Sequence, residues 1–467
     1  MLGMGNMRQW LMNISLVGGW FPAAAFAVIA VLSVTLLVSA AVSKRDGRIL
    51  ATVLPIGVAA VSGMVGYVVA WLLSDVFVVF GVGLGSRVMS WVAAGFAIAG
   101  FAIVHIVLSR GMMRVAAAIL TVFAILAAAI GIDQSYGEYA TTGHGGVGEF
   151  PSRKADLTGL AKRKDLITVA QWRKQAANGT IRNIPANGTV NKIDIPATKS
   201  QFEARKALVY LPPAALADSK RKPALPVVLM LSGQPGSPGR VFQAGGIQTM
   251  MDGYAKTHDG LAPIVIAADQ LGADSHNTLC VDSKVYGNAL TYLTQDVVDW
   301  VKTNLPAAQD AKDWAIAGFS QGATCSLQIG VNHPDLFGTM IPTDSEIKPT
   351  NGSRQEMIDR FFDGDTTAYE NQVPVNAIRN HAPTHQMLII GAGEKDTTSI
   401  RNVKTIAPVA AKAGMRVAAV ESSGNAHDWH AVQDVLRYGL AVFGHDTGLD
   451  GANPNLSDYP NLKRITI

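Results

Sequence analysis

The stretch Asp313-Trp-Ala-Ile-Ala-Gly-Phe-Ser-Gln-Gly322 decides the fold that the sequence predicts. Its mostly apolar residues 314–317 predict a short buried strand, and residues 323–333 predict a helix. Between them, residues 318–322 match the pattern G-x-S-x-G. A strand, a sharp turn and a helix form the context in which a nucleophile elbow exposes a serine hydroxyl above a sheet. Ser320 is therefore the predicted nucleophile.

The two glycines of this motif support the same prediction. Any side chain at Gly318 or Gly322 would collide with the neighbouring strand or helix of such an elbow. A five-residue match can also arise by chance in a chain that holds 46 glycines. The strand before the motif and the helix after it favour the functional interpretation.

Further apolar runs predict the rest of the sheet. The expected strands are 190–195 and 207–211, which are antiparallel, followed by 227–231, 264–268, 314–317, 339–342, 387–390 and 417–420. Runs that are apolar on both faces, separated by helical stretches such as the amphipathic 289–304, are typical of a largely parallel sheet covered by helices on both faces. We expect this α/β domain over residues 188–445 and a surface extension over 446–467.

The first third of the chain is too apolar for a soluble domain. The whole sequence is 49% hydrophobic and only 16% charged, with a mean hydropathy of +0.22. Four uncharged runs hold the excess, and each is long enough to cross a hydrocarbon core as a helix: 11–43, 49–74, 88–109 and 115–132. Residues 1–132 are therefore predicted to form a four-helix transmembrane domain, with Pro22 near an interfacial lead-in.

Basic residues set the predicted orientation. Lys44, Arg45 and Arg48 separate the first two runs, and Arg110 and Arg114 separate the last two. Short basic loops stay in the cytoplasm, so both termini and the large C-terminal domain are expected outside it. A single arginine near the N-terminus argues weakly for the opposite orientation.

Residues 133–187 are predicted to link the two domains. Gln134–Arg153 is polar and rich in glycine, which is typical of a linker, and Asp156–Gln175 is expected to form a short crossover helix. The pairs Asn178-Gly and Asn187-Gly match glycosylation patterns, but we interpret them as turns.

Charge and cysteine content limit the possible partners. A net charge of +4 with no cluster of basic and aromatic residues does not predict nucleic-acid binding. Cys280 and Cys325 are far apart in sequence and show no zinc-site spacing. Outside the cytoplasm they could form one disulfide, or Cys325 could be a small buried residue, and the sequence leaves both open.

A serine nucleophile needs a base and an orienting acid, which follow it in the order Ser, Asp or Glu, His in α/β-hydrolases. The acid is expected in the loop after strand 387–390. Asp396 is the predicted acid, Glu394 is the alternative two residues earlier, and Asp344 after the preceding strand is a third candidate.

The base is expected after the last strand, 417–420. His427 lies there in a glycine-containing loop just before a helix, from which an imidazole can reach across the ends of the strands. His430 lies about one turn into that helix and is the competing candidate.

The negative oxygen of a tetrahedral intermediate needs two preorganised backbone N–H donors. Gln321 follows the nucleophile and should supply the first. The glycine-rich loop 232–236 should supply the second from Gln234, because Pro235 has no N–H.

Several motifs together carry a resemblance to a known family. V-Y-L-P-P (209–213), G-F-S-Q-G (318–322), G-A-G-E-K-D (391–396) and N-A-H-D-W (425–429) are similar to motifs of the putative-esterase family. That family includes esterase D-like enzymes and the secreted mycolyltransferases of the antigen complex. The resemblance covers about residues 190–443, and the segments 292–300 and 425–429 look closest to the mycolyltransferases.

This resemblance implies a serine acyl-enzyme mechanism through Ser320, His427 and Asp396 or Glu394, with no cofactor and no metal. We expect an extracytoplasmic ester hydrolase or acyltransferase, anchored in a bacterial plasma membrane. Its substrates would be acyl esters or lipids of the envelope, with a glycan as a possible acceptor. The alternatives are a catalytically inactive envelope scaffold and a serine peptidase of the same fold. Ser232-Gly233 and Gly322-Ala323 depart from the pairs usual in the family.

Overall fold

The computed structural model describes residues 14–16, 19–42, 48–77, 85–137, 139, 150, 152–161, 163–181 and 183–467. The chain divides into two compact units, residues 1–149 and 150–467, which are considered separately. Lys44, Arg45 and most of the predicted linker 134–153 lie outside the described residues, as does the N-terminal arginine, so the predicted orientation stays a prediction.

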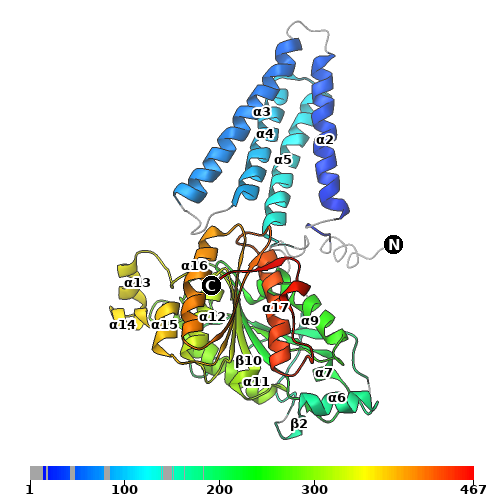
Figure 1. The fold of residues 1–467 in the computed structure, drawn as a ribbon. Helices are drawn as coiled ribbons and strands as arrows, with labels where there is room; N and C mark the ends of the chain where they lie inside the picture. The colour runs from blue at the N-terminus through cyan, green and yellow to red at the C-terminus, as the bar shows by residue number, and fades with distance from the viewer. Residues whose placement is uncertain are drawn as a thin grey trace. The chain divides into compact units, whose positions relative to one another are not determined.

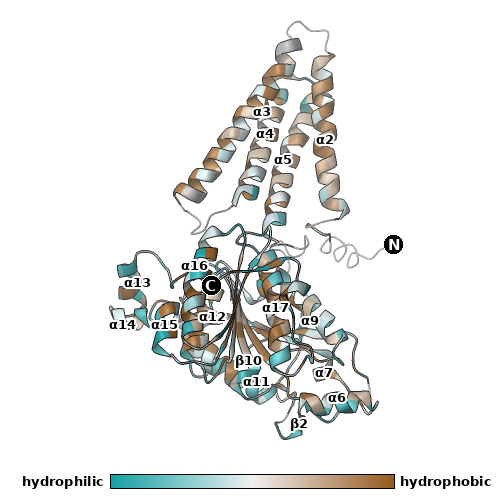
Figure 2. Cartoon of the chain, viewed as in Figure 1, coloured by the Kyte–Doolittle hydropathy of each residue, from teal (hydrophilic) through white to brown (hydrophobic). Residues whose placement is uncertain are grey.

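The first unit consists of long apolar helices. They are α2 (Trp20–Ala41), α3 (Arg48–Trp71), α4 (Gly85–Leu108) and α5 (Met112–Tyr136) (Figure 1). These four helices are long and apolar enough to cross a membrane, which agrees with the four predicted runs. Pro22 occupies the first turn of α2, where a proline is tolerated. Apart from Ile467, every exposed large apolar side chain among the described residues belongs to this unit, and Figure 2 shows its hydrophobic colouring.

The second unit is built on a ten-stranded sheet with the order β1-β3-β4-β7-β6-β10-β11-β12-β13-β14. Its strands are β1 (Arg153–Lys154), β3 (Thr189–Ile193), β4 (Ala207–Leu211), β6 (Val227–Leu231), β7 (Ile264–Ala267), β10 (Trp314–Phe319), β11 (Thr339–Thr343), β12 (Met387–Gly393), β13 (Arg416–Ser422) and β14 (Leu462–Arg464). From β7 to β13 every neighbouring pair is parallel, whereas β4 pairs antiparallel with β3 and β7. Strand β10 lies between β6 and β11, so the predicted elbow is central.

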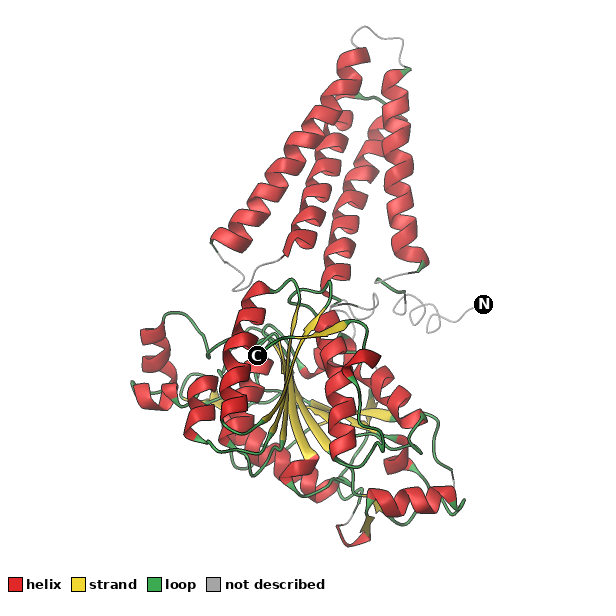
Figure 3. Ribbon diagram, viewed as in Figure 1, coloured by secondary structure: helices red, strands yellow, loops and turns green. Residues whose placement is uncertain are grey.

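Helices cover both faces of this sheet (Figures 1 and 3). One face carries α8 (Pro238–Gln243), α9 (Ile247–Lys256) and α17 (Trp429–Asp446), and the other carries α11 (Val297–Asn304), α12 (Gln321–Asn332) and α16 (Thr397–Lys412). Successive residues of β6 show why. Val228 packs into the core beneath α17, whereas Leu229 packs into the core beneath α12. Alternating side chains thus bury both faces, which confirms the predicted mostly parallel sheet with helices on both sides.

Shorter elements decorate this frame. They are α6 (Val169–Ala177), α7 (Pro213–Leu216), α10 (Ala289–Thr291), α13 (Arg354–Phe361), α14 (Thr366–Glu370), α15 (Pro374–Asn380), β2 (Leu166–Ile167), β5 (Lys222–Pro223), β8 (Asp282–Ser283) and β9 (Gly287–Asn288). The helix expected over 289–304 is interrupted by a π-helical turn at Tyr292–Asp296.

The crossover helix differs from its prediction over 156–175. The structure places a loop, a 3-10 turn at Arg163–Asp165 and strand β2 there, and α6 begins only at Val169. Thr168 starts the helix because its side chain accepts a hydrogen bond from the Gln171 N–H, and the Gln171 side chain reciprocates. This capping box fixes the start of α6 at Val169, which is 13 residues after the predicted start at Asp156.

The C-terminal tail also differs from the expected surface extension over 446–467. Its strand β14 pairs antiparallel with β13 and closes one edge of the sheet. Leu462 and Ile465 are buried there, and burial of their apolar side chains holds the tail against the sheet. The tail is therefore part of the fold.

Candidate active site

The predicted elbow forms at the end of β10. Ser320 has φ 55° and ψ −118°, a left-handed backbone conformation that is strained for a residue with a side chain. A Cβ atom on Gly318 would lie 2.2 Å from the Gly322 carbonyl oxygen, and one on Gly322 would lie 2.3 Å from the Ser232 carbonyl oxygen. Both glycines are required by this close approach of backbones, and the turn lifts Ser320 to the carboxyl ends of the strands.

Two hydrogen bonds connect three of the predicted residues. The Ser320 Oγ atom lies 2.9 Å from Nε2 of His427, and Nδ1 of His427 lies 2.7 Å from Oδ2 of Asp396. A carboxylate can only accept, so Nδ1 carries the proton and Nε2 is free to accept the serine proton. The side chains of His427 and Asp396 are only 12% and 11% exposed, so solvent does not compete strongly for these bonds.

Local capping holds the acid and the base in place. Asp396 precedes α16 and accepts hydrogen bonds from the N–H and the hydroxyl of Ser399, at 3.0 and 2.6 Å. Asp428, beside His427, caps α17 by accepting from the Ala431 N–H at 3.0 Å. Each loop is thus fixed at a helix N-terminus.

The two competing residues lie elsewhere. Glu394 accepts from the Gly424 N–H at 2.7 Å and pairs with Lys463 at 2.9 Å, on a partly exposed surface. His430 is the second residue of α17. Among the described contacts, neither residue joins the bonds between Ser320, His427 and Asp396.

Burial and charge set the protonation of this group. Burial alone lowers the pKa of His427, but the hydrogen bond to Asp396 and the charges of Asp344, Asp396 and Asp428 outweigh it and raise that pKa above 6.5. Burial raises the pKa of Asp396, yet the hydrogen bond and charge of His427, with the bonds from Ser399, bring it below its usual value. When this pair gains a proton, the proton therefore resides on the His427 imidazole, and Asp396 remains a carboxylate.

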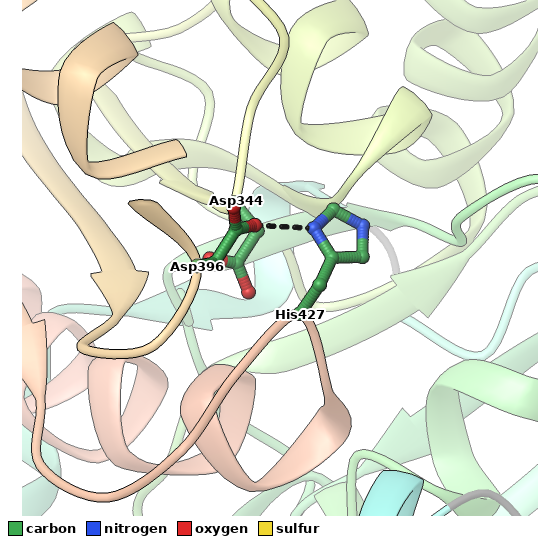
Figure 4. A group of neighbouring side chains, drawn as sticks. All are labelled: Asp344, Asp396 and His427. Carbon is green, nitrogen blue, oxygen red and sulfur yellow. Dashed lines mark hydrogen bonds and ion pairs between the residues drawn. The ribbon is translucent and has the colours of Figure 1, made fainter. Parts of the chain in front are cut away.

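Asp344, the third candidate acid, lies beside this pair without joining it (Figure 4). It is 1% exposed, and its Oδ1 atom accepts a hydrogen bond from the Gly393 N–H at 2.9 Å. Burial raises the pKa of Asp344 well above its usual value, and the charge of His427 offsets that effect only in part.

The segments that carry the two predicted oxyanion donors, Gln321 and Gln234, both approach Ser320. Gln321 is the first residue of α12, so its N–H has no acceptor within the helix. The loop 232–236 approaches from β6, and a Cβ atom on Gly233 would lie 3.4 Å from Cβ of Ser320. Arg205 supports this loop by donating to the Gly236 carbonyl oxygen at 2.9 Å while it pairs with buried Asp269.

Sequence reasoning missed the residues that support Gln321. Buried Gln270 donates to the Ser232 carbonyl oxygen at 2.6 Å and to Oε1 of Gln321 at 3.2 Å. The Gln321 side chain in turn donates to Oδ1 of Asn277 at 3.3 Å. No local pattern marks Gln270 or Asn277, because both reach the elbow from a loop that only the tertiary fold brings near.

A disulfide joins that loop to the helix of the elbow. Cys280 and Cys325 are bonded, with Cα atoms 5.7 Å apart, and the structure thereby decides between the two alternatives that the sequence left open. The bond ties the segment carrying Asn277 to α12 at Cys325, five residues after Ser320. The disulfide therefore cross-links two segments that both contribute residues around Gln321.

Comparison with known proteins identifies the family. The profile of a family described as "Putative esterase" matches residues 199–439, which span β4 to α17 and include the elbow, Asp396 and His427. The chain belongs to this esterase family. Its membership confirms the predicted resemblance and supports an ester hydrolase or acyltransferase.

A relative of this esterase is known from Corynebacterium glutamicum. It is an uncharacterised protein that is 31% identical over 331 residues, covering 70% of this chain and 74% of the relative. This alignment of 331 residues is longer than the family match over residues 199–439, so it extends beyond the matched region.

Solved structures show weaker likenesses. An S-formylglutathione hydrolase from Agrobacterium tumefaciens is 16% identical, with a TM-score of 0.46, and the match covers 57% of this chain and 99% of that one. MPT51 of Mycobacterium tuberculosis is 14% identical, with a TM-score of 0.40 and coverage of 55% and 98%. The family assignment rests on the profile and on the relative.

Proposed function

We propose that this esterase is a serine ester hydrolase or acyltransferase, anchored in a bacterial plasma membrane, that acts outside the cytoplasm on acyl esters of the envelope. One observation carries the chemical part of the proposal: the unbroken chain of hydrogen bonds from Ser320 through His427 to Asp396 at the elbow. A serine hydroxyl is a weak nucleophile by itself, and this chain is what activates it.

The proposed reaction has two halves. The Ser320 Oγ atom attacks the ester carbonyl while Nε2 of His427 takes the hydroxyl proton, and Asp396 stabilises the resulting imidazolium. The backbone N–H groups of Gln321 and Gln234 are the proposed donors to the oxyanion. Collapse of the intermediate breaks the ester C–O bond, and the leaving alcohol receives the proton from His427. Water or an acceptor hydroxyl then attacks the acyl-enzyme by the reverse sequence.

A fluorophosphonate probe tests the nucleophile. The full-length protein in detergent should be labelled, and Ser320→Ala should abolish labelling because it removes the attacking oxygen. Ser237→Ala, in the loop next to the oxyanion donors, is the matched control and should remain labelled. Labelling that survives Ser320→Ala would refute the assignment, and a wild-type protein that is never labelled would favour the inactive scaffold.

The peptidase alternative has its own test. Both chemistries pass through an acyl-enzyme, so labelling does not separate them. Family membership favours esters, and p-nitrophenyl esters should be turned over, whereas matched p-nitroanilide peptides should not. Faster cleavage of the peptides would replace the ester proposal with a peptidase.

The membrane part of the proposal rests on the four apolar helices and on the basic residues between them. Alkaline phosphatase folds to activity only outside the cytoplasm, so a fusion after Ile467 should be active. A fusion within residues 44–48 should be inactive. The opposite pattern would place the esterase domain in the cytoplasm and remove the case for an envelope substrate.

The proposed substrate follows from the tether. An enzyme fixed in a membrane meets esters in or near that membrane, such as acyl lipids and acylated glycolipids. Incubation with short- and long-chain acyl esters, with and without trehalose as a glycan acceptor, separates hydrolysis from transfer. An acylated sugar would establish transfer, and turnover of short soluble esters alone, unaffected by lipid, would contradict the membrane-lipid proposal.

A further inference from the structure

Asp344 is held rigidly against the strand that carries the acid. It follows β11 directly, with φ 54°, and its backbone N–H donates to the Gly391 carbonyl oxygen at 2.9 Å. Its Oδ1 atom accepts from the Gly393 N–H at 2.9 Å, and Gly393 is the last residue of β12. Together these bonds hold Asp344 against the end of β12, where Gly393 precedes Asp396 by three residues.

The other oxygen of this carboxyl is buried without a partner. Oδ2 of Asp344 has no hydrogen-bond partner among the described residues, and neither do the buried hydroxyls of Thr343 and Ser345 on either side. A buried carboxylate with a single backbone donor is disfavoured, because one hydrogen bond does not compensate for its removal from water. The neutral carboxylic acid is the form of Asp344 that this environment accepts.

The charges around Asp344 lead to the same conclusion. One oxygen of Asp344, one oxygen of Asp396 and one ring nitrogen of His427 all lie within 4.8 Å of one another. Figure 4 shows the two carboxyl groups side by side, with the bond from Asp396 to the ring. Asp428 adds a further negative charge, and among the described residues His427 is the cationic group that acts on Asp344. Two neighbouring carboxyls with one partial cation hold one negative charge more readily than two.

We propose that Asp344 is a reserve acid: it stands as the protonated member of a carboxyl pair with Asp396, and it becomes the orienting carboxylate for His427 when Asp396 is neutralised. This proposal rests on the proposed function, because it assigns Asp344 a positioning role in the same reaction. In the intact protein Asp396 carries the charge. Burial is the main reason why Asp344 keeps its proton, and the negative charge of Asp396 adds to it. Loss of that charge lets the proton leave to solvent at a lower pH than in the intact protein, which puts an anion within 4.8 Å of the ring.

Four full-length proteins in detergent test the proposal: the wild type, Asp344→Asn, Asp396→Asn and the double variant. Asparagine keeps the oxygen that accepts from the Gly393 N–H, so the fold is disturbed little. With p-nitrophenyl butyrate, kcat/KM should fall by about tenfold or less in Asp344→Asn, by ~100-fold in Asp396→Asn and by ~10,000-fold in the double variant. Equal losses in Asp396→Asn and the double variant would overturn the proposal.

The pH profile of Asp396→Asn gives a readout that a merely structural role would not move. Because Asp344 must lose its proton to act, the residual kcat/KM of Asp396→Asn should rise with pH beyond the point where the wild type has levelled off. The double variant should lack this rise. Asp396→Ala should repeat the profile without an amide beside the ring.

The outcomes separate this proposal from the one before it. If the wild type hydrolyses no ester and takes no fluorophosphonate label, the proposed function fails. If the wild type is active but the Asp396→Asn profile shows no rise with pH, only the reserve acid fails. That single-variant profile decides the matter even if Asp344→Asn does not fold.

Discussion

Two loops at the same edge of the sheet each carry two carboxyl groups spaced two residues apart. The pKa values of these carboxyls are shifted in opposite directions in the two loops. The loop after β11 presents Asp344 and Glu346, and the loop after β12 presents Glu394 and Asp396. In the loop after β12, Asp396 meets His427 and Ser399, and Glu394 meets Lys463 and a backbone N–H. Both carboxyls there have a lowered pKa.

The loop after β11 offers its carboxyls fewer donors. Asp344 has one backbone N–H, and the Glu346 carboxylate accepts no hydrogen bond from any described residue. Burial raises the pKa of Glu346 to about 7, and the charge of His427 offsets that effect only partly. The comparison teaches that the spacing of acids after a strand does not set their charge. Donors brought from distant segments decide which loop supplies a carboxylate.

The largest expected effect tests the loop after β12 against itself. Asp396→Asn should lower kcat/KM by ~100-fold, since the imidazole loses its orienting charge and its correct tautomer, even with Asp344 in reserve. Glu394→Gln, two residues away, should retain activity within about twofold, because its partners lie outside the active site. Steady-state hydrolysis of p-nitrophenyl butyrate measures both. Equal losses of kcat/KM in the two variants would contradict the assignment of Asp396 as the orienting acid.

A second prediction concerns the stability of the loop after β11. The pKa of Glu346 is raised in the folded state to about 7 from 4.5, so folding favours its protonated form. Its contribution to stability is present below pH 4.5 and is lost as the pH rises through 7. Glu346→Gln should therefore match the wild type at pH 4.5 and exceed its free energy of unfolding by ~2 kcal/mol at pH 8. Urea unfolding followed by near-UV circular dichroism measures the difference, and a variant destabilised at pH 8 would contradict it.

The third prediction uses the histidine that both loops face. His427 must be neutral to accept the serine proton, and its pKa is raised above 6.5 by Asp396 and the surrounding carboxyls. Activity should therefore be lost as the pH falls, by about tenfold per pH unit, with a midpoint above 6.5. The rate of fluorophosphonate labelling should show the same midpoint, since it needs no product release. A midpoint well below 6.5 in both assays would mean that the carboxyls do not raise this pKa.

The smallest effect is expected at the exposed end of the loop after β12. Lys463 and Glu394 form an ion pair whose side chains are 56% and 38% exposed. Exposed pairs contribute little, because water solvates both charges when they separate. Lys463→Ala should leave the melting temperature unchanged within error, in low and in high salt. A salt-dependent loss would give this pair a structural role that its exposure argues against.

Some features followed directly from local sequence. The nucleophile elbow was predictable because its chemistry is encoded within ten residues, 313–322, with a buried strand before it and a helix after it. The strands β4 and β6 form at the predicted positions, since apolar runs bounded by prolines and glycines have few other solutions. The four apolar helices followed for a similar reason, because length and lack of charge are local properties.

Other features depended on segments that are distant in sequence. The capping box of α6 is an exception, because its pattern, Thr168 and Gln171 three residues apart, is local and was overlooked. The edge strand β14 was missed because its pairing depends on where β13 lies in the fold. The disulfide was left open for the same reason. Its cysteines are 45 residues apart, and only the fold brings their Cα atoms within bonding range.

The sequence by itself determined that a serine elbow, an acid loop and a histidine loop follow one another along an α/β sheet. It could not decide which carboxyl faces the imidazole, because Asp396, Glu394 and Asp344 all follow strands that end at the same edge. Only the tertiary structure decided, by placing Ser399 and His427 around Asp396, Lys463 beside Glu394, and almost no donor around Asp344. The charge of a buried carboxyl depends on donors and neighbours in space, and local sequence does not contain them.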